Sequence, residues 1–180
     1  MGDPADGRRA RFEALYSAHG RRILGYALRR TSQPADAADV LAEAFLVAWR
    51  RLDDVPDGAE AGLWLYAVAR RVLANQRRGS RRRAALGERL AGVLAEHVAP
   101  DPAEDAGTGA AMRAALAALP ESDREVLLLA GWEGLTAPEI AVVIDVPAAT
   151  VRTRLHRARA RLRAAYGDER PLVRDHEDQP

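Results

Sequence analysis

The sequence predicts an all-α protein made of two small helical domains joined by a flexible linker. Of the 180 residues, 48% are hydrophobic and only 5% are aromatic, a composition that favours small helical bundles over sheets. Apolar residues also recur at helical spacing in several segments, and no segment shows a convincing strand pattern. Between residues 84 and 109 the helical pattern weakens, and this weak stretch separates the two domains.

Three helices are expected in the first domain, each with a stripe of apolar residues. The stripe of the helix over 10–30 consists of Phe12, Leu15, Tyr16, His19, Ile23 and Tyr26. The stripe of the helix over 35–52 consists of Leu41, Phe45, Ala48 and Leu52. The stripe of the helix over 63–78 consists of Leu65, Val68, Ala69 and Val72. A break at 32–34 and a loop over 53–62, rich in Asp, Gly and Pro, separate these helices.

The segments outside the two domains have loop compositions. After a short helix over 84–97, prolines and glycines among acidic residues indicate a flexible linker. The predicted divisions are a disordered N-terminus (1–9), a first domain (10–84), a linker (85–109), a second domain (110–166) and a disordered tail (167–180).

The second domain reads as a series of short helices with clear boundaries. Pro120 ends the first of them. Ser122–Glu125 and Thr136–Glu139 both match the capping box, in which a hydroxyl and a carboxylate satisfy the free amides of a helix's first turn. Val146-Pro147 ends one helix and starts the next, because the residue before proline avoids helical geometry. The last two helices therefore form a helix-turn-helix.

The last helix combines a narrow apolar seam with a strongly basic opposite side. The seam residues, at i, i+4, i+7 and i+11, are Val151, Leu155, Ala158 and Leu162. Opposite or beside the seam lie Arg152, Thr153, His156, Arg157, Ala160 and Arg163. Arg, Thr and His at the N-terminal half suit base edges in a major groove, and the later arginines suit phosphates. The alternative is a solvated, arginine-rich surface helix.

Charge and residue types exclude several classes of protein. The net charge is only +1, but basic residues gather at 70–89 and 152–163, which suggests two contacts with a polyanion. The chain has no cysteine, so thiolate metal sites and cysteine nucleophiles are excluded. The four histidines lie in separate segments, so neither a catalytic triad nor a metal cluster is visible. We therefore expect no enzyme activity and no cofactor.

With no signal peptide and no long apolar run, we expect a cytoplasmic protein without membrane insertion.

The second domain resembles that of the extracytoplasmic-function (ECF) sigma factors of bacterial RNA polymerase. The matching motifs are Leu119-Pro120, Arg124-Glu125-Val126, Gly134-Leu135-Thr136, Glu139-Ile140-Ala141, Val146-Pro147, the segment 150–155 and Arg157-Ala158-Arg159. The resemblance implies that Arg152, Thr153, His156 and Arg157 read a −35 promoter element, with Thr136 near the phosphate backbone. Asp145 and Ala149 replace two glycines of the family pattern. Asp tolerates a left-handed backbone better than most residues, so the turn can survive.

The helix over 35–52 resembles the family's polymerase-binding helix. Asp36, Asp39 and Glu43 form a carboxylate stripe beside its apolar face. From physics alone, acids near a helix N-terminus complement the helix dipole, and this reading stays open for Asp36 above all. The resemblance implies that the stripe grips the largest subunit of core polymerase. Ala42 stands where the family often has Gln.

The helix over 63–78 resembles the family's helix for the −10 element. Arg70, Arg71, Arg77 and Arg78 lie opposite its apolar face, and Trp64 and Asn75 share a flank with Arg71. An arginine face edged by an aromatic residue suits single-stranded DNA. The alternative is a surface helix with snorkelling arginines and Trp64 in the core. The resemblance implies that this helix and the loop over 53–62 capture flipped −10 bases, although Arg71 occupies the family's usual Asn position.

Together these features predict a promoter-specificity subunit without enzyme activity. The partners that the resemblance implies are core RNA polymerase, promoter DNA and an anti-sigma factor. A free-standing helix-turn-helix regulator, acting without polymerase, is the alternative function. It leaves the acidic stripe and the basic helix over 63–78 unexplained.

Overall fold

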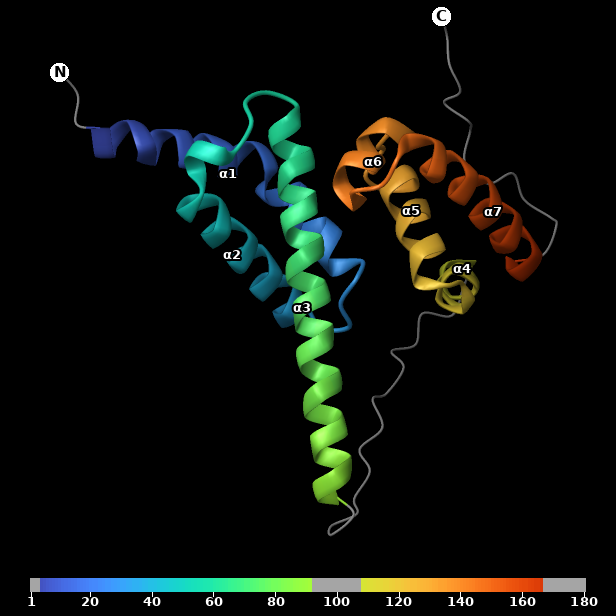
Figure 1. The fold of residues 1–180 in the computed structure, drawn as a ribbon. Helices are drawn as coiled ribbons and strands as arrows, with labels where there is room; N and C mark the ends of the chain where they lie inside the picture. Colours follow the sequence, from blue (N-terminus) through green and yellow to red (C-terminus); the bar gives the residue numbers. More distant parts are fainter. Residues whose placement is uncertain (1–3, 92–107, 167–180) are drawn as a thin grey trace, which may run out of the picture. The chain divides into compact units, whose positions relative to one another are not determined.

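The computed structural model describes residues 4–91 and 108–166, with side chains over 6–79 and 111–166. Over these residues the chain forms seven α-helices and one short 3-10 helix, with no strand (Figure 1). The helices divide into two compact units, α1–α3 and α4–α7. The predicted fold class, all-α with two helical domains, is confirmed. Most of the predicted linker and the whole predicted tail lie outside the described residues.

The first unit contains α1 (Pro4–Leu28), α2 (Pro34–Arg50), the 3-10 helix η1 (Leu52–Asp54) and α3 (Glu60–Ala91). Each of the three long helices packs against the other two. The largest fully buried side chains of this core are Ile23, Tyr26, Val40, Leu52 and Leu65. Burying each such side chain contributes about 1.5–3 kcal/mol. The predicted stripes are only partly correct: Tyr16 is 48% exposed, and in α2 Val40 is fully buried, whereas the predicted Leu41 is half-buried.

Two helices of the first unit are longer than the sequence pattern predicts. α1 begins at Pro4, so residues 4–9 are helical instead of disordered. Their order has a tertiary cause, because Arg8 contacts the end of α2. α3 runs from Glu60 to Ala91 instead of 63–78, and it takes in the start of the short helix expected over 84–97. Ala, Leu and Arg favour helix, and no proline interrupts this segment.

The second unit contains α4 (Thr108–Ala118), α5 (Glu121–Gly131), α6 (Ala137–Ile144) and α7 (Ala148–Tyr166). α7 packs against each of the other three helices. Val126, Leu129, Ile140 and Val151 are fully buried at the centre of this bundle. The last helix is thus supported along one side by the whole domain.

The two predicted capping boxes have different outcomes. At Thr136 the box is present: the Thr136 amide donates to Glu139 Oε2 at 2.7 Å, and the Glu139 amide donates to Thr136 Oγ1 at 3.5 Å. At Ser122 it is absent, because α5 begins at Glu121 with Pro120 as its N-cap. Ser122 is therefore already inside the first turn. The prediction of a Ser122 capping box was wrong.

A side-chain contact of α5 joins this helix to the end of α4. Arg124 donates from Nε to the Leu116 carbonyl at 2.8 Å, and from Nη2 to the carbonyls of Ala117 and Leu119 at 2.8 and 3.0 Å. The last carbonyls of a helix have no partner within the helix. Arg124 satisfies three carbonyls at the end of α4 and so fixes the angle between α4 and α5.

The turn between α6 and α7 has the left-handed backbone that the sequence predicted. Asp145 has φ 56° and ψ 57°. Its amide and that of Val146 both donate to the Ala141 carbonyl, which closes α6 as in a Schellman-type cap. Asp therefore stands in for the family's turn glycine without disturbing the helix-turn-helix.

Candidate nucleic-acid interface

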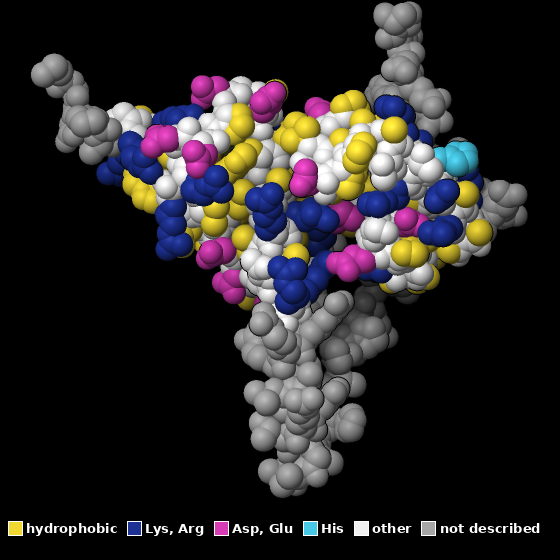
Figure 2. All heavy atoms as spheres, viewed as in Figure 1, with side chains coloured by type: hydrophobic (Ala, Val, Ile, Leu, Met, Phe, Trp, Pro, Cys, Tyr) yellow, Lys and Arg dark blue, Asp and Glu magenta, His cyan; other side chains and the backbone are white. Residues whose placement is uncertain are grey.

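The second unit presents α7 as predicted. Val151, Leu155, Ala158 and Leu162 are all buried, whereas Arg152, Thr153, His156 and Arg157 are exposed. Thr153 Oγ1 also donates to the Ala149 carbonyl at 3.1 Å. On the face drawn in Figure 2, arginine side chains lie on the surface of both units. The exposed side of α7 can therefore meet a polyanion along its N-terminal half.

Thr136 lies at the exposed start of α6, the first helix of the helix-turn-helix. Its hydroxyl donates to Glu139 Oε2 at 2.7 Å and accepts from the Glu139 amide. The capping box thus occupies its side chain. Helix N-termini favour anions because their first amides and their dipole are positive. Thr136 is placed where a phosphate could approach this helix end.

One of the arginines of α7 has a partner inside the domain. Arg161 Nη1 donates to Oδ2 of Asp123, a residue of α5 whose side chain is only 6% exposed. A buried carboxylate without a partner would strongly destabilise the fold. Arg161 therefore joins α7 to α5, and sequence spacing gave no signal of this pair.

The three predicted polymerase-binding acids, Asp36, Asp39 and Glu43, are all exposed on α2. Two large apolar residues further along this helix, Leu46 and Trp49, are also exposed, by 40% and 38%. The exposed side of α2 is therefore acidic in its first half and partly apolar in its second. The predicted apolar stripe of this helix leaves out Leu46 and Trp49, but the sequence analysis did not consider that they would extend the exposed side of α2.

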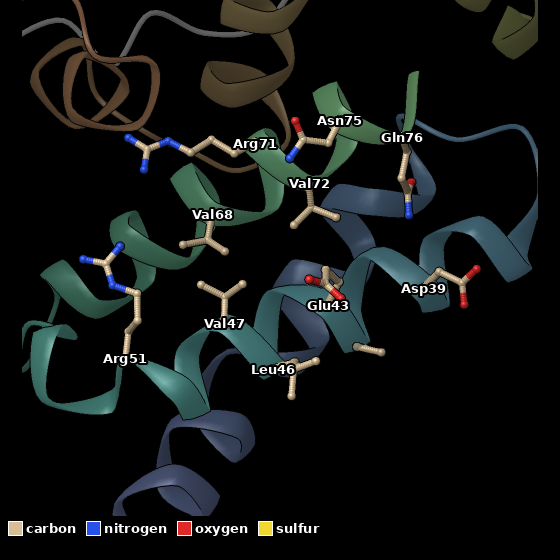
Figure 3. A pocket seen from close by; sticks show the side chains of 11 residues that line it. Asp39, Glu43, Leu46, Val47, Arg51, Val68, Arg71, Val72, Asn75 and Gln76 are labelled. Atoms are coloured by element: carbon tan, nitrogen blue, oxygen red, sulfur yellow. The ribbon is translucent and has the colours of Figure 1, made fainter. Parts of the chain in front are cut away.

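A groove of about 610 Å³ lies between α2 and α3 (Figure 3). Val47 of α2 and Val68 and Val72 of α3 point toward one another along its floor. Asp39, Glu43, Arg71 and Asn75 are among the polar residues that line it. Asp39 and Glu43, predicted to bind polymerase, therefore line the same groove as Arg71 and Asn75, predicted to bind DNA. The sequence did not predict that these two sets of residues lie close together.

The predicted basic face of α3 is only partly exposed. Arg70, Arg71 and Arg78 are exposed, and Arg78 donates to the exposed Asn75 side chain. Arg77 is half-buried, and its Nη2 donates to the Arg30 carbonyl at 3.2 Å. Arg77 therefore joins α3 to the residues just after α1. Trp64 is half-buried near the start of the same helix, as both readings of the sequence allowed.

His19 of α1 is a packing residue at the start of α3. A Cβ added to Gly62 would lie 3.2 Å from His19 Cε1, so a larger residue there would push the imidazole back by a few tenths of an ångström. Burial lowers the pKa of His19 below its usual 6.5, and the nearby positive charge of Arg22 lowers it further. His19 thus favours the neutral form in the folded domain.

Among the residues that the structure describes, no three His, Cys, Asp or Glu side chains are grouped to hold a metal ion. Over the same residues, no helix is long and apolar enough to cross a bilayer.

Both units match regions of one family, in the same order along the chain. The pattern of sigma-70 region 2 matches residues 15–83, and that of sigma-70 region 4 matches residues 109–162. The chain therefore belongs to the sigma-70 family of transcription initiation factors.

Relatives define the branch of that family. The chain is 34% identical over 155 residues to the ECF RNA polymerase sigma factor SigL of Mycobacterium tuberculosis, covering 86% of this chain and 88% of the relative. It is 31% identical over 159 residues to the RNA polymerase sigma-E factor of Streptomyces avermitilis, covering 88% of this chain and 87% of the relative. The chain is thus an ECF sigma factor.

Solved structures agree with this fold. CnrH in complex with the cytosolic domain of CnrY is similar, with a TM-score of 0.61 and 27% identity, covering 88% of this chain and 89% of that one. The sigma factor RpoE from Bartonella quintana, solved with the anti-sigma factor NepR, has a TM-score of 0.70 at 24% identity, covering 88% and 98%. The latter supports the fold alone.

Proposed function

We propose that this chain is an alternative sigma factor that binds core RNA polymerase and directs it to specific promoters by reading −10 and −35 elements. One observation carries the proposal. The two helical units match regions 2 and 4 of the sigma-70 family in order, and each exposes arginines on a helix. Catalysis belongs to the polymerase in this proposal, so the chain itself is not an enzyme. Its site of action is the cytoplasm, where the polymerase works.

In the proposal, α7 enters the major groove at the −35 element. Arg152, Thr153, His156 and Arg157 contact base edges, and the start of α6 at Thr136 contacts a phosphate. Their exposure on one side of a helix that the domain core supports favours these roles. A bidentate contact between Arg and guanine contributes about 1–3 kcal/mol of discrimination.

The −10 element meets α3 and the loop between α2 and α3. The exposed residues Arg70, Arg71 and Arg78 neutralise the backbone of the melted strand, Asn75 bonds a base and Trp64 supplies a stacking surface. Arg77 has a smaller share, because its guanidinium already bonds the Arg30 carbonyl. Its half-buried position makes it chiefly a support of the helix.

Core polymerase docks on the exposed side of α2. Asp36, Asp39 and Glu43 meet a basic surface of the polymerase, and Leu46 and Trp49 extend the contact with apolar area. An interface with an apolar centre and a charged rim is typical of specific protein complexes. An anti-sigma factor is the further partner in this proposal, as the resemblance to ECF sigma factors implies; the sigma factor RpoE, which shares the fold, was solved with the anti-sigma factor NepR.

Transcription with purified components tests the proposal against a helix-turn-helix regulator that acts alone. Core polymerase is supplied with genomic DNA, with and without the full chain, and transcript starts are mapped. A sigma factor produces new starts that share two upstream elements, and the chain co-elutes with the core. The regulator alternative predicts DNA binding with no new start and no co-elution.

A further inference from the structure

Two arginines from the first turns of α1 hold the loop between α2 and α3. Arg8 donates from Nη2 to the Trp49 carbonyl at 2.6 Å and from Nη1 to Asp53 Oδ2 at 3.3 Å. Its guanidinium carbon lies 5.2 Å from the centroid of the Trp49 ring. Arg11 donates from Nη2 to the Val55 carbonyl at 2.8 Å and to Asp57 Oδ1 at 3.0 Å. Arg8 thus joins the last turn of α2 to a carboxylate of the loop, and Arg11 joins a backbone carbonyl and a carboxylate of the loop itself.

Local contacts shape the rest of this loop. The 3-10 helix over Leu52–Asp54 ends when the Val55 amide donates to the Leu52 carbonyl at 3.2 Å. Val55 itself is buried, and Gly58 takes a left-handed backbone with φ 66°. These contacts fix single turns. The buried side chains of Leu52 and Val55 hold the loop to the core, and the two arginines of α1 add polar contacts between the loop and another helix.

The arginines also offset the charge of the loop. Asp53, Asp54 and Asp57 would together repel a nucleic-acid backbone. Arg8 pairs with Asp53 and Arg11 with Asp57, while Arg51 pairs with Asp54 at 2.9 Å. Asp53 and Asp57 are 87% and 94% exposed, and ion pairs this exposed contribute little to folding. These pairs nevertheless offset the negative charge that an approaching phosphate would meet.

We propose that Arg8 and Arg11 are positioning residues for promoter opening. They set the path of the loop and compensate its negative charge, so that it can approach the −10 strand. Neither residue needs to touch a base. This inference rests on the proposed function, in which the loop and α3 capture the melted −10 bases.

The test compares two double variants of the full chain, each assembled with core polymerase. R8A/R11A removes the anchors. R9A/R21A is the control, since it removes two positive charges from the same helix. Arg9 pairs with Glu13 within α1 at 2.8 Å, and Arg21 is exposed. Open complexes are measured by permanganate reactivity of unpaired thymines, at a mapped promoter and at its single-base −10 and −35 variants.

We expect R8A/R11A to lower open-complex formation at low salt by about tenfold relative to R9A/R21A, or about 1.4 kcal/mol. It should also weaken discrimination among −10 variants and leave −35 discrimination unchanged. The difference should shrink as salt rises, because salt screens the uncompensated carboxylates. R8K/R11K should restore only the salt-dependent part of open-complex formation and not the discrimination among −10 variants. Lysine supplies the positive charge but lacks the planar fork that spans a carbonyl and a carboxylate.

Equal −10 discrimination by R8A/R11A and R9A/R21A would overturn the inference. If R8A/R11A fails to fold, the lysine variant decides, because wild-type −10 discrimination in R8K/R11K would equally refute it. A wild-type chain that never initiates with core polymerase refutes the proposed function, and this inference falls with it. If the wild-type chain initiates with core polymerase and R8A/R11A behaves like R9A/R21A, only this inference is refuted and the proposed function stands.

Discussion

The predicted contacts with DNA depend mainly on arginines, and the surroundings of each arginine in the structure separate them into two groups. Arg152, Arg157, Arg70 and Arg71 are exposed on their helices. Others bond the protein itself: Arg124 holds carbonyls of α4, Arg161 holds Asp123, and Arg77 holds the Arg30 carbonyl. A guanidinium with a planar fork suits both tasks. At the scale of the residue, function therefore depends on which arginines bond a backbone carbonyl or a buried carboxylate of the protein and which present an exposed side chain.

Arg157 belongs to the first group, and its replacement tests base reading. Arg157→Ala should reduce binding most at promoters with a particular −35 base, by about 1–3 kcal/mol, because a base contact discriminates and a phosphate contact does not. Binding to a panel of single-base −35 variants measures this. Arg163→Ala, at the other end of the same exposed side, is the matched control. An equal loss on every sequence would assign Arg157 to the phosphate backbone.

His19 predicts a pH dependence of the first domain. Because burial lowers its folded-state pKa below 6.5, the unfolded chain takes up a proton first as the pH falls. Above the pKa of His19 in the unfolded chain, this residue does not affect stability. As the pH falls below that pKa and through the lower pKa of the folded state, the folded domain loses stability. His19→Gln should therefore reduce the loss of stability as the pH falls below the ordinary histidine pKa of 6.5.

Chemical denaturation at several pH values, followed by a probe in the first domain, measures this effect. His156→Gln removes an imidazole from the surface of the other domain and serves as the control. A slope of stability against pH that His19→Gln leaves unchanged would contradict the prediction.

At the scale of the element, periodicity predicts a helix and its buried side, but not its tertiary partners. The seam of α7 and the Thr136 box follow from spacing and local chemistry, and both are present. The Ser122 box fails because Pro120 already starts α5. The groove between α2 and α3 depends on residues that only folding brings together. The Ser122 miss is therefore a local error of one helix start, whereas the groove is a contact between segments distant in the sequence.

The basic face of α3 illustrates the difference, since it contains both groups of arginine. Arg78→Ala should lower the salt dependence of promoter binding, by about 0.7–0.9 in the slope of log K against log salt for one phosphate contact. Arg77→Ala should change that slope less and should destabilise the first domain, because it leaves the Arg30 carbonyl without this donor.

Salt titrations of open-complex formation and thermal unfolding of the two variants separate these effects. An equal change of slope for both residues would mean that the Arg77 side chain leaves the Arg30 carbonyl when DNA binds. An unchanged slope for Arg78→Ala would remove it from the interface.

At the scale of the whole molecule, the acidic stripe of α2 and the basic side of α7 belong to two separate units. In the proposed function a sigma factor uses both surfaces, because polymerase must be recruited and a promoter must be selected. The tether between the units adds an effective concentration: once one unit is bound, the other binds in an intramolecular step. Loss of one surface should therefore weaken the complete assembly without changing what the other surface recognises.

Replacing Asp39 and Glu43 together by Ala tests this separation. Both side chains are exposed on α2, so the fold should persist, as thermal unfolding can verify. Affinity for core polymerase should fall by about tenfold or more, since two exposed charges that meet a basic partner each contribute on the order of 1 kcal/mol. Discrimination among −35 variants should stay at the wild-type level in the holoenzyme that still forms.

The control replaces Asp6 and Glu13, two exposed acids of α1, by Ala and so removes the same charge elsewhere on the same domain. Undiminished co-elution of the α2 variant with core polymerase would refute the docking role of the stripe, whereas altered −35 discrimination would show that the two surfaces are coupled.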